Sequence, residues 1–295
     1  MILRESCLPA GWYPRERAKI AQFLSSSVKT AQNSLSAGEN ASAALAAVAP
    51  HAGWYYSGQT AALALSSLDS EAETIAIIGG HLGGTMPVLF AEEDAAETPL
   101  GPIRIDGELR EAFTGKIKCH PDIYDDNTVE VLIPMVRFFF PKASLLWLRF
   151  PANLSSFDSG KILAETASSL GRKLTVIAST DLTHYGRNYG FFPQGSGRSA
   201  LEWVKNVNDA AFIGAVLDGD PARTLACAEG SKSACSAGAV LGALGFAAAR
   251  GKRARLLDYR TSADAGGQGE GQDDYDVPDS FVGYAALSFN LDQND

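Results

Sequence analysis

Several common signatures are missing from this sequence, and each absence excludes a class of protein. The chain has only four cysteines and no CxxC pair, so neither a disulfide scaffold nor a thiol redox motif is indicated. No stretch approaches the roughly 18 apolar residues of a membrane span, and the first residues lack the apolar run of a signal peptide. We therefore expect free thiols and a cytoplasmic protein with no membrane partner.

Basic charge and the common catalytic motifs are also scarce. The formal net charge is −9 and the Lys and Arg residues are dispersed, whereas nucleic-acid binding needs a basic stripe, so no nucleic-acid partner is expected. The chain has no G-x-S-x-G elbow, no H-E-x-x-H helix, and no P-loop or dinucleotide fingerprint. It also lacks the CxxxCxxC cluster motif, so it is not itself a radical SAM enzyme.

What the sequence does contain is an alternation of apolar runs and helical patterns. Hydrophobic residues make up 46% of the chain, enough for one large core, and no linker divides it, so we predict a single domain over 1–295. Strands are expected at 45–49, 74–78, 145–148, 174–179, 253–261 and 280–289, and helices at about 57–68, 106–114, 128–140, 158–170, 199–217 and 234–249. This order predicts a layered α/β fold, with a long acidic loop at 266–279.

Three of the four histidines follow predicted strands directly. His51, His81 and His184 lie in polar or glycine-rich turns, and sites in open α/β sheets gather at the carboxyl ends of strands. Taken singly, each is most simply a loop histidine, but their joint placement favours convergence. Cys235 lies at the start of the predicted 234–249 helix, a position that favours a thiolate. Imidazoles with one thiolate form sites for zinc, iron or copper.

Two carboxylates are candidates for proton chemistry. Asp181 and His184, three residues apart in STDLTHYG, suit an orienting pair or an acid and a base, while the simpler alternative is that Asp181 caps a turn. Glu130, in DDNTVEVLIP, begins an apolar helix, where a carboxylate is also favoured by the helix dipole alone.

An ordered series of motifs along nearly the whole chain resembles the MEMO family, whose bacterial and archaeal members include AmmeMemoRadiSam system protein B. The motifs are PAGWYP, APHAGWYYSGQTAA, TPLGPIRID, DDNTVEVLIP, STDLTHYG, SACSAGAVLGAL and VGYAALSF. The family is similar to class III extradiol dioxygenases. The resemblance implies a layered sandwich with a central mixed, largely parallel sheet flanked by helices. It also implies that the metal ligands are His51, His81 and Cys235. The catalytic residues beside them would be His184, Asp181 and Glu130.

The resemblance implies a metal-dependent, dioxygenase-like oxidoreductase of unknown substrate. Fe(II) is the expected metal, with copper or zinc as alternatives, or no metal at all. Two departures from the family bear on this: His81 stands in GGHLG instead of GPSHH, and Asn127 replaces a histidine.

Two other functions stay open. One is a non-enzymatic protein that binds a peptide or a partner protein through the same pocket, with Arg149 or Arg187 beside it if the ligand carries phosphate. Whether the ligand is a small molecule or a peptide stays open. The other is a component of a modification pathway with AMMECR1-type and radical SAM partner proteins.

Overall fold

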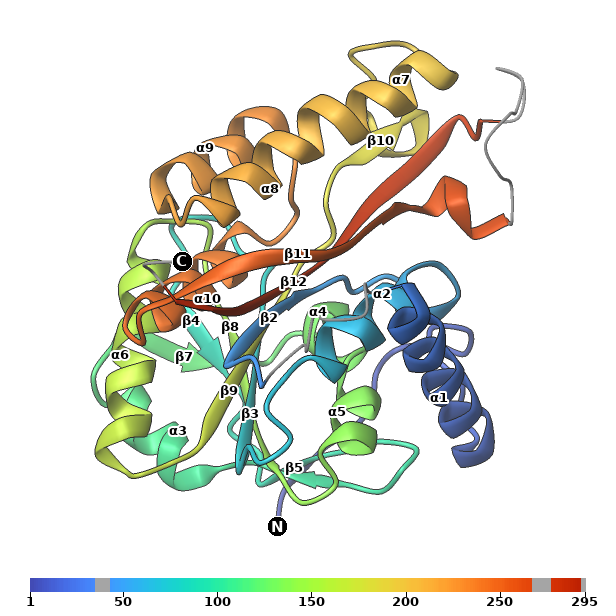
Figure 1. Cartoon of the computed structure of the whole chain (residues 1–295). Coiled ribbons are helices and arrows are strands. Elements are labelled where there is room, and N and C mark those ends of the chain that lie inside the picture. Colours follow the sequence, from blue (N-terminus) through green and yellow to red (C-terminus); the bar gives the residue numbers. More distant parts are fainter. Residues whose placement is uncertain (35–42, 267–276, 293–295) are drawn as a thin grey trace.

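The computed structural model describes residues 1–34, 43–266 and 277–292, and its centre is a mixed sheet flanked by helices (Figure 1). The strands are β1 (Leu3–Arg4), β2 (Ala46–Ala49), β3 (Thr74–Gly79), β4 (Val88–Phe90), β5 (Ala95–Ala96), β6 (Ile103–Arg104), β7 (Cys119–Pro121), β8 (Ser144–Arg149), β9 (Leu174–Ser179), β10 (His184–Gly186), β11 (Lys252–Thr261) and β12 (Ser280–Asp292). The α-helices are α1 (Arg17–Ser34), α2 (Trp54–Ser66), α3 (Gly107–Thr114), α4 (Asn127–Glu130), α5 (Ile133–Phe139), α6 (Ser155–Ser169), α7 (Arg198–Trp203), α8 (Asp209–Leu217), α9 (Pro221–Ser231) and α10 (Ala237–Ala248). Short 3₁₀ segments η1 (Arg187–Tyr189) and η3 (Ser262–Gly266), and a π-helical turn η2 (Val204–Asn208), complete the described elements.

The order of strands in the main sheet is β10-β12-β2-β9-β3-β8-β4-β7, with β11 paired to β12. The four central strands β2, β9, β3 and β8 are parallel, whereas β12 and β4 join them antiparallel on either side. The predicted α/β sandwich with a mixed sheet is therefore confirmed. A separate small sheet, β1-β5-β6, lies outside this path.

The central strands are apolar at successive positions because helices cover both faces of the sheet. Ala76 and Ile78 pack into one buried cluster with residues of α3, α6, α8 and α10. Ile75 and Ile77, which point the opposite way, pack into a second cluster with residues of α1, α2 and α5. Figure 1 shows α3 and α6 on one side of the sheet and α1, α2 and α5 on the other.

Helices α6 and α10 approach each other so closely that glycine is required at the contact. A Cβ at Gly160 would overlap the carbonyl oxygen of Gly242, and one at Gly245 would overlap that of Phe157. Because α10 carries no side chain at these points, its backbone lies directly against α6. This packing fixes α10 on the sheet, and with it the loop that precedes the helix.

The six main strands and most helices lie where the sequence predicts them, and the differences have local causes. The predicted 128–140 helix is interrupted between α4 and α5, where Pro134 cannot donate to the carbonyl of Glu130. Helix α2 begins at Trp54, not near Ser57, because Trp54 N donates to the distant Trp12 carbonyl. Helices α1 and α9 were not predicted.

Three further findings concern the sequence predictions. Most of the predicted acidic loop, 267–276, lies outside the described residues. All four cysteines are free thiols, as expected. Within the described ranges, no helix has the length and apolarity needed to cross a membrane.

Because α6 and α10 pack so closely, adding a single methyl group at their contact should destabilise the folded protein. Gly245→Ala should lower the free energy of unfolding by about 1–3 kcal/mol, because backbone atoms must move to admit the Cβ. Gly230→Ala is the matched control, since Gly230 lies within α9 and a Cβ there meets nothing within 4 Å. Urea unfolding followed by circular dichroism checks both; equal stabilities for the two variants would contradict this account of the interface.

Candidate metal centre

Strand order brings the candidate site residues to one edge of the sheet. Strands β2, β9 and β3 are adjacent and parallel, so their carboxyl ends meet at the same edge. His51 follows β2, Asp181 follows β9 and His81 follows β3. Cys235 comes from the opposite direction, on the loop just before α10, where its backbone N–H donates to the Asp181 carbonyl at 3.2 Å. Four segments that are distant in sequence therefore meet here.

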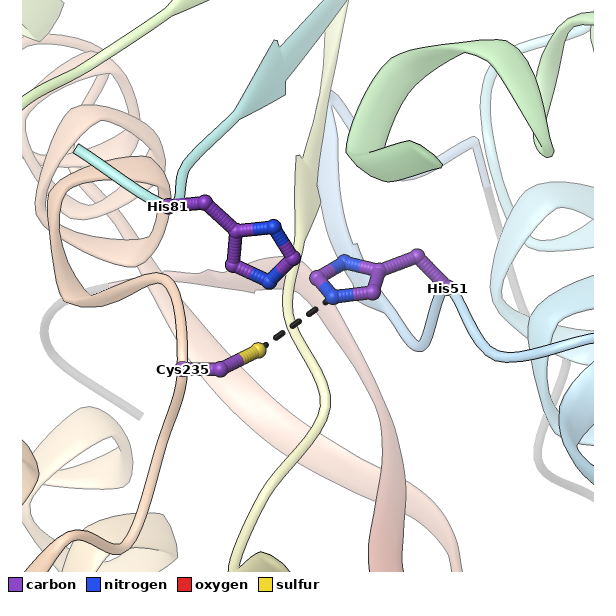
Figure 2. Close-up of side chains that lie close together, drawn as sticks. All are labelled: His51, His81 and Cys235. Atoms are coloured by element: carbon purple, nitrogen blue, oxygen red, sulfur yellow. Dashed lines mark hydrogen bonds between the residues drawn. The ribbon is translucent and has the colours of Figure 1, made fainter. Parts of the chain in front are cut away.

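His51, His81 and Cys235 form a compact set of donor atoms (Figure 2). Nε2 of His51 lies 3.2 Å from Sγ of Cys235, and the two imidazole rings meet edge to face with their centroids 5.0 Å apart. One ligand atom from each residue lies within 4.8 Å of the other two. Nitrogen and sulfur ligands of one tetrahedral zinc ion are about 3.5 Å apart, given the usual metal–ligand bond lengths. The three residues could therefore hold a metal ion.

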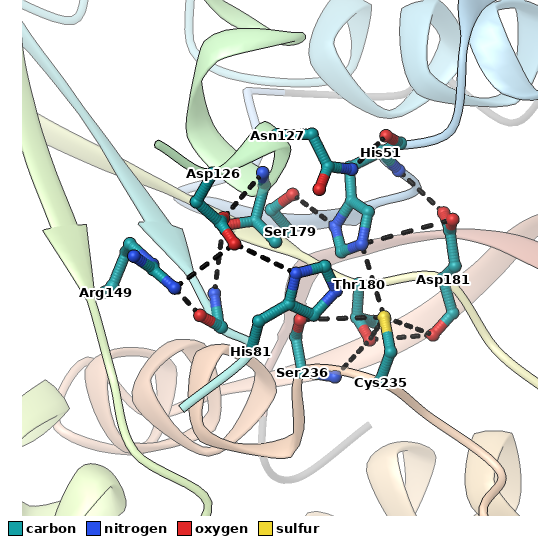
Figure 3. Close-up of polar contacts among 12 residues, drawn as sticks. His51, His81, Asp126, Asn127, Arg149, Ser179, Thr180, Asp181, Cys235 and Ser236 are labelled. Carbon is teal, nitrogen blue, oxygen red and sulfur yellow. Dashed lines mark hydrogen bonds and ion pairs between the residues drawn. The ribbon is translucent and has the colours of Figure 1, made fainter. Parts of the chain in front are cut away.

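Neighbouring side chains orient both imidazoles (Figure 3). Nδ1 of His51 lies 2.9 Å from Oγ of Ser179, and Nδ1 of His81 lies 3.0 Å from a carboxylate oxygen of Asp126. With Nδ1 engaged in each ring, Nε2 is left as the ligand atom, which is the usual arrangement around protein-bound metals. Asp126 is in turn paired with Arg149 at 3.2 Å.

Glycines permit the approach of His81 to Cys235. A Cβ at Gly80 would overlap Ser236, the neighbour of Cys235, and one at Gly79 would overlap Oγ1 of Thr128. His81 itself has φ +57°, a left-handed conformation that is uncommon for a residue with a side chain and that turns its ring toward the sulfur. The GGHLG sequence thus delivers one histidine to the site by close backbone packing.

The cluster carries opposite charges even without a metal. Burial would raise the pKa of the Cys235 thiol, yet the charges and hydrogen bonds of His51 and His81 lower it well below its usual range. Burial disfavours charge on the two histidines, but Asp126 and Cys235 outweigh it at His81 and raise its pKa to about 10. At His51, Cys235 and Asp181 likewise outweigh burial and raise the pKa. The sulfur is therefore held as a thiolate, the form that binds metals.

Asp181 and His184 both border this cluster, as the sequence suggested. The Asp181 carboxylate is buried, accepts from the His51 backbone N–H at 2.7 Å, and lies 4.0 Å from His51 Nε2. Burial raises the pKa of this carboxyl, with the Cys235 thiolate acting in the same direction. Nδ1 of His184 donates to the Leu182 carbonyl at 3.1 Å, which leaves Nε2 as the proton-accepting nitrogen when the ring is neutral.

Glu130 does not join them. Its carboxylate accepts hydrogen bonds from the backbone N–H groups of Cys7 and Leu8 and from the hydroxyl of Tyr13, at 2.8 to 3.1 Å. The residue lines a different cavity, next to Cys7, and is absent from the lining of the pocket at His51. The carboxylate of Glu130 thus holds the amino-terminal segment in place, and the catalytic role that the resemblance implies stays a prediction.

A pocket of about 690 Å³ opens in front of His51 and His81. Asn127, which stands where the family has histidine, lines it and donates to the His51 carbonyl at 3.0 Å. The two arginines proposed as phosphate ligands are absent from its lining. Arg149 is buried and already bonded to Asp122, Asp126 and the Gly80 carbonyl.

Sequence reasoning missed several residues that shape the site. They include the orienting residues Ser179 and Asp126 and the pocket aromatics Trp12, Tyr56, Tyr189 and Tyr284. Ser179 could have been found, because it ends the same apolar strand that leads to Asp181. The aromatics come from four separate segments, and no local pattern marks them as neighbours.

A buried carboxylate supports the segment that carries Asp181 and His184. Asp209 is fully buried and accepts from the backbone N–H and the hydroxyl of Thr183, and from the Tyr259 hydroxyl at 2.8 Å. Burial raises its pKa to about 6, against the opposing effect of these hydrogen bonds. No cation pairs with it in the described part of the chain.

The raised pKa of Asp209 predicts a specific pH dependence of stability. Between about pH 4 and pH 6 the folded chain keeps a proton that the unfolded chain has released, so stability falls as pH rises through this window. The loss at pH 7 should be up to about 3 kcal/mol, and Asp209→Asn should remove it. Urea unfolding at pH 4 to 7 tests this, with the surface variant Asp218→Asn as control. Parallel pH curves for wild type and Asp209→Asn would contradict it.

Comparison with known proteins points to the same family as the sequence motifs do. Residues 4–288 match the family described as Memo-like protein. A MEMO1 family protein of Pyrococcus abyssi is 31% identical over 258 residues, which are 82% of this chain and 85% of the relative. A MEMO1 family protein of Thermococcus kodakarensis is 31% identical over 260 residues, 83% of this chain and 86% of the relative.

Among solved structures, an uncharacterized protein of Escherichia coli K12 is similar with a TM-score of 0.40 and 14% identity, over 72% of this chain and 86% of that one. That similarity is too low to support an argument about this chain. The sequence match over nearly the full length does support one: the chain belongs to the Memo-like protein family.

Proposed function

We propose that this protein binds one transition-metal ion through His51 Nε2, His81 Nε2 and Cys235 Sγ, and acts as a metal-dependent oxidoreductase. The observation that carries the proposal is the cluster itself: three donor atoms within 4.8 Å, two of them on imidazoles whose other nitrogen is already engaged. If these loop residues did not share a ligand, nothing would require the imidazole rings of His51 and His81 both to face the sulfur of Cys235.

The donor set narrows the choice of metal. Three protein ligands leave coordination positions open for substrate, which is typical of catalytic and not of structural metal sites. Iron is our first candidate and copper the second, since imidazole suits both and a thiolate favours Cu(I). When bound, such a metal would supply redox chemistry at the base of the pocket.

Asp181 and His184 are placed to move protons beside that position. The pKa of the Asp181 carboxyl is raised, so this group can hold a proton at a higher pH than an exposed aspartate. His184 lines the same pocket, and its Nε2 can accept a proton from a bound molecule. A catalytic role for either residue is part of the proposal.

The alternative of a phosphopeptide-binding protein finds no support in the pocket. Phosphate recognition relies on Arg or Lys side chains, and none is present among the described residues that line the pocket.

Metal content after anaerobic purification without a His tag tests the proposal. Wild-type protein should carry close to one iron or copper per chain, whereas His51→Ala and Cys235→Ala should each lose most of it, because two ligands bind far more weakly than three. Cys227→Ala is the matched control, since this thiol lies in α9 and outside the cluster. Elemental mass spectrometry provides the measurement. Wild-type protein that stays free of metal after reconstitution would sink the proposal.

The glycine that admits His81 offers an independent test of the geometry. In Gly80→Ala the new Cβ meets Ser236, so the His81 turn and the Cys235 loop must separate, and metal affinity should fall by at least about tenfold. Gly83→Ala should bind metal as wild type does, because a Cβ there meets nothing within 4 Å. Competition with a chelator of known affinity measures both. Equal affinities would show that the cluster does not depend on this close approach.

A further inference from the structure

The pocket in front of the candidate metal centre has a chemical character of its own. We infer that it binds a small aromatic molecule, and that the substituent of this molecule that lies farthest from His51 and His81 carries no negative charge. The inference rests on the proposed function for the identity of the site, but ring binding itself can be measured without a metal.

Aromatic side chains from four separate segments form the walls. Trp12 comes from the amino-terminal segment, Tyr56 from the first turn of α2, Tyr189 from η1 and Tyr284 from β12. Tyr284 is buried, whereas Tyr56 and Tyr189 are about half exposed. Aromatic walls of this kind favour a ring that packs edge to face or offset against them.

The positions of two of these walls are fixed by contacts on the protein side. The Trp12 carbonyl accepts from the Trp54 N–H at 2.8 Å, and the segment before it is held by Glu130. The Tyr189 ring packs edge to face on His184, with the centroids 5.0 Å apart. The Trp12 backbone and the Tyr189 ring are therefore positioned by the protein before a ligand arrives, which lowers the entropic cost of binding.

Apart from the metal cluster, Asp181 and His184, the polar groups that line the pocket are uncharged. They are Asn127, Asn188, Ser262 and Ser280, besides the aromatic side chains. The described lining contains no Lys or Arg, and its one carboxylate is Asp181. A carboxylate or phosphate at the outer end of a ligand would lose water without gaining a cation. An amide or hydroxyl there would find matching hydrogen-bond partners.

Asn188 is the position where this preference can be reversed. It lines the pocket, lies exposed on η1, and its backbone N–H donates to Ser280 Oγ at 3.1 Å. An arginine at this surface position would add the missing cation without burying it. Gln194 is a matched control site, because it is exposed in the same segment and absent from the pocket lining.

The test uses two probes of nearly equal shape, neutral 4-hydroxyphenylacetamide and anionic 4-hydroxyphenylacetate. Calorimetric titration of metal-free and zinc-loaded protein should show the amide binding at least about tenfold more tightly than the acetate. Asn188→Arg should shift the ratio toward the acetate by about tenfold or more, while Gln194→Arg should leave it unchanged. Trp12→Ala should weaken both probes together.

The outcomes separate this inference from the proposed function. If 4-hydroxyphenylacetate bound as tightly as 4-hydroxyphenylacetamide to metal-free or to zinc-loaded wild-type protein, the inference would be overturned. If the protein never took up metal but still preferred 4-hydroxyphenylacetamide, the inference would be upheld although the proposed function had failed. Failure of Asn188→Arg to change the ratio would also overturn it, since the preference would then not arise from the charge of this lining.

Discussion

The site depends on Asp181, which connects the ends of two strands to the loop before α10. Its carboxylate accepts from the His51 backbone N–H at 2.7 Å, and its own carbonyl accepts from the Cys235 N–H at 3.2 Å. Parallel pairing of β2 with β9 already brings the two strand ends level, and the hydrogen bonds fix the residues beyond them. The distance between His51 Nε2 and Cys235 Sγ is therefore set by backbone contacts and does not rely on flexible side chains alone.

The same edge of the sheet contains a chain of charges that offset one another, buried at Asp122 and Arg149 and partly exposed at His81. Asp122 pairs with Arg149, Arg149 with Asp126, and Asp126 with His81. The chain ends at the Cys235 thiolate, whose negative charge is balanced by the two imidazoles. The buried pair, Asp122 and Arg149, stays charged because each partner is paired and hydrogen-bonded. A bound metal would replace the protons on the imidazoles as the partner of the sulfur, so metal binding and protonation compete at this site.

The sequence was sufficient where the information is local. Apolar runs predicted β2, β3, β8 and β9, and the rule that sites follow the strand ends indicated that His51, His81 and His184 converge; all three line one pocket. It was not sufficient where distant segments meet. The glutamate at position 130 stands in a family motif, but only the structure shows its carboxylate bound to Cys7, Leu8 and Tyr13. The aromatic pocket walls could not be predicted either, since each belongs to a different segment.

X-ray absorption spectroscopy of the metal-loaded protein tests the central claim most directly, because it reports which atoms surround the metal. For the zinc-loaded protein the account predicts one sulfur at about 2.3 Å and imidazole nitrogen at about 2.0–2.1 Å, with the sulfur contribution lost in Cys235→Ser. A first shell of oxygen and nitrogen without sulfur in the wild-type protein would contradict it, and would mean that His51, His81 and Cys235 do not act together as a metal site.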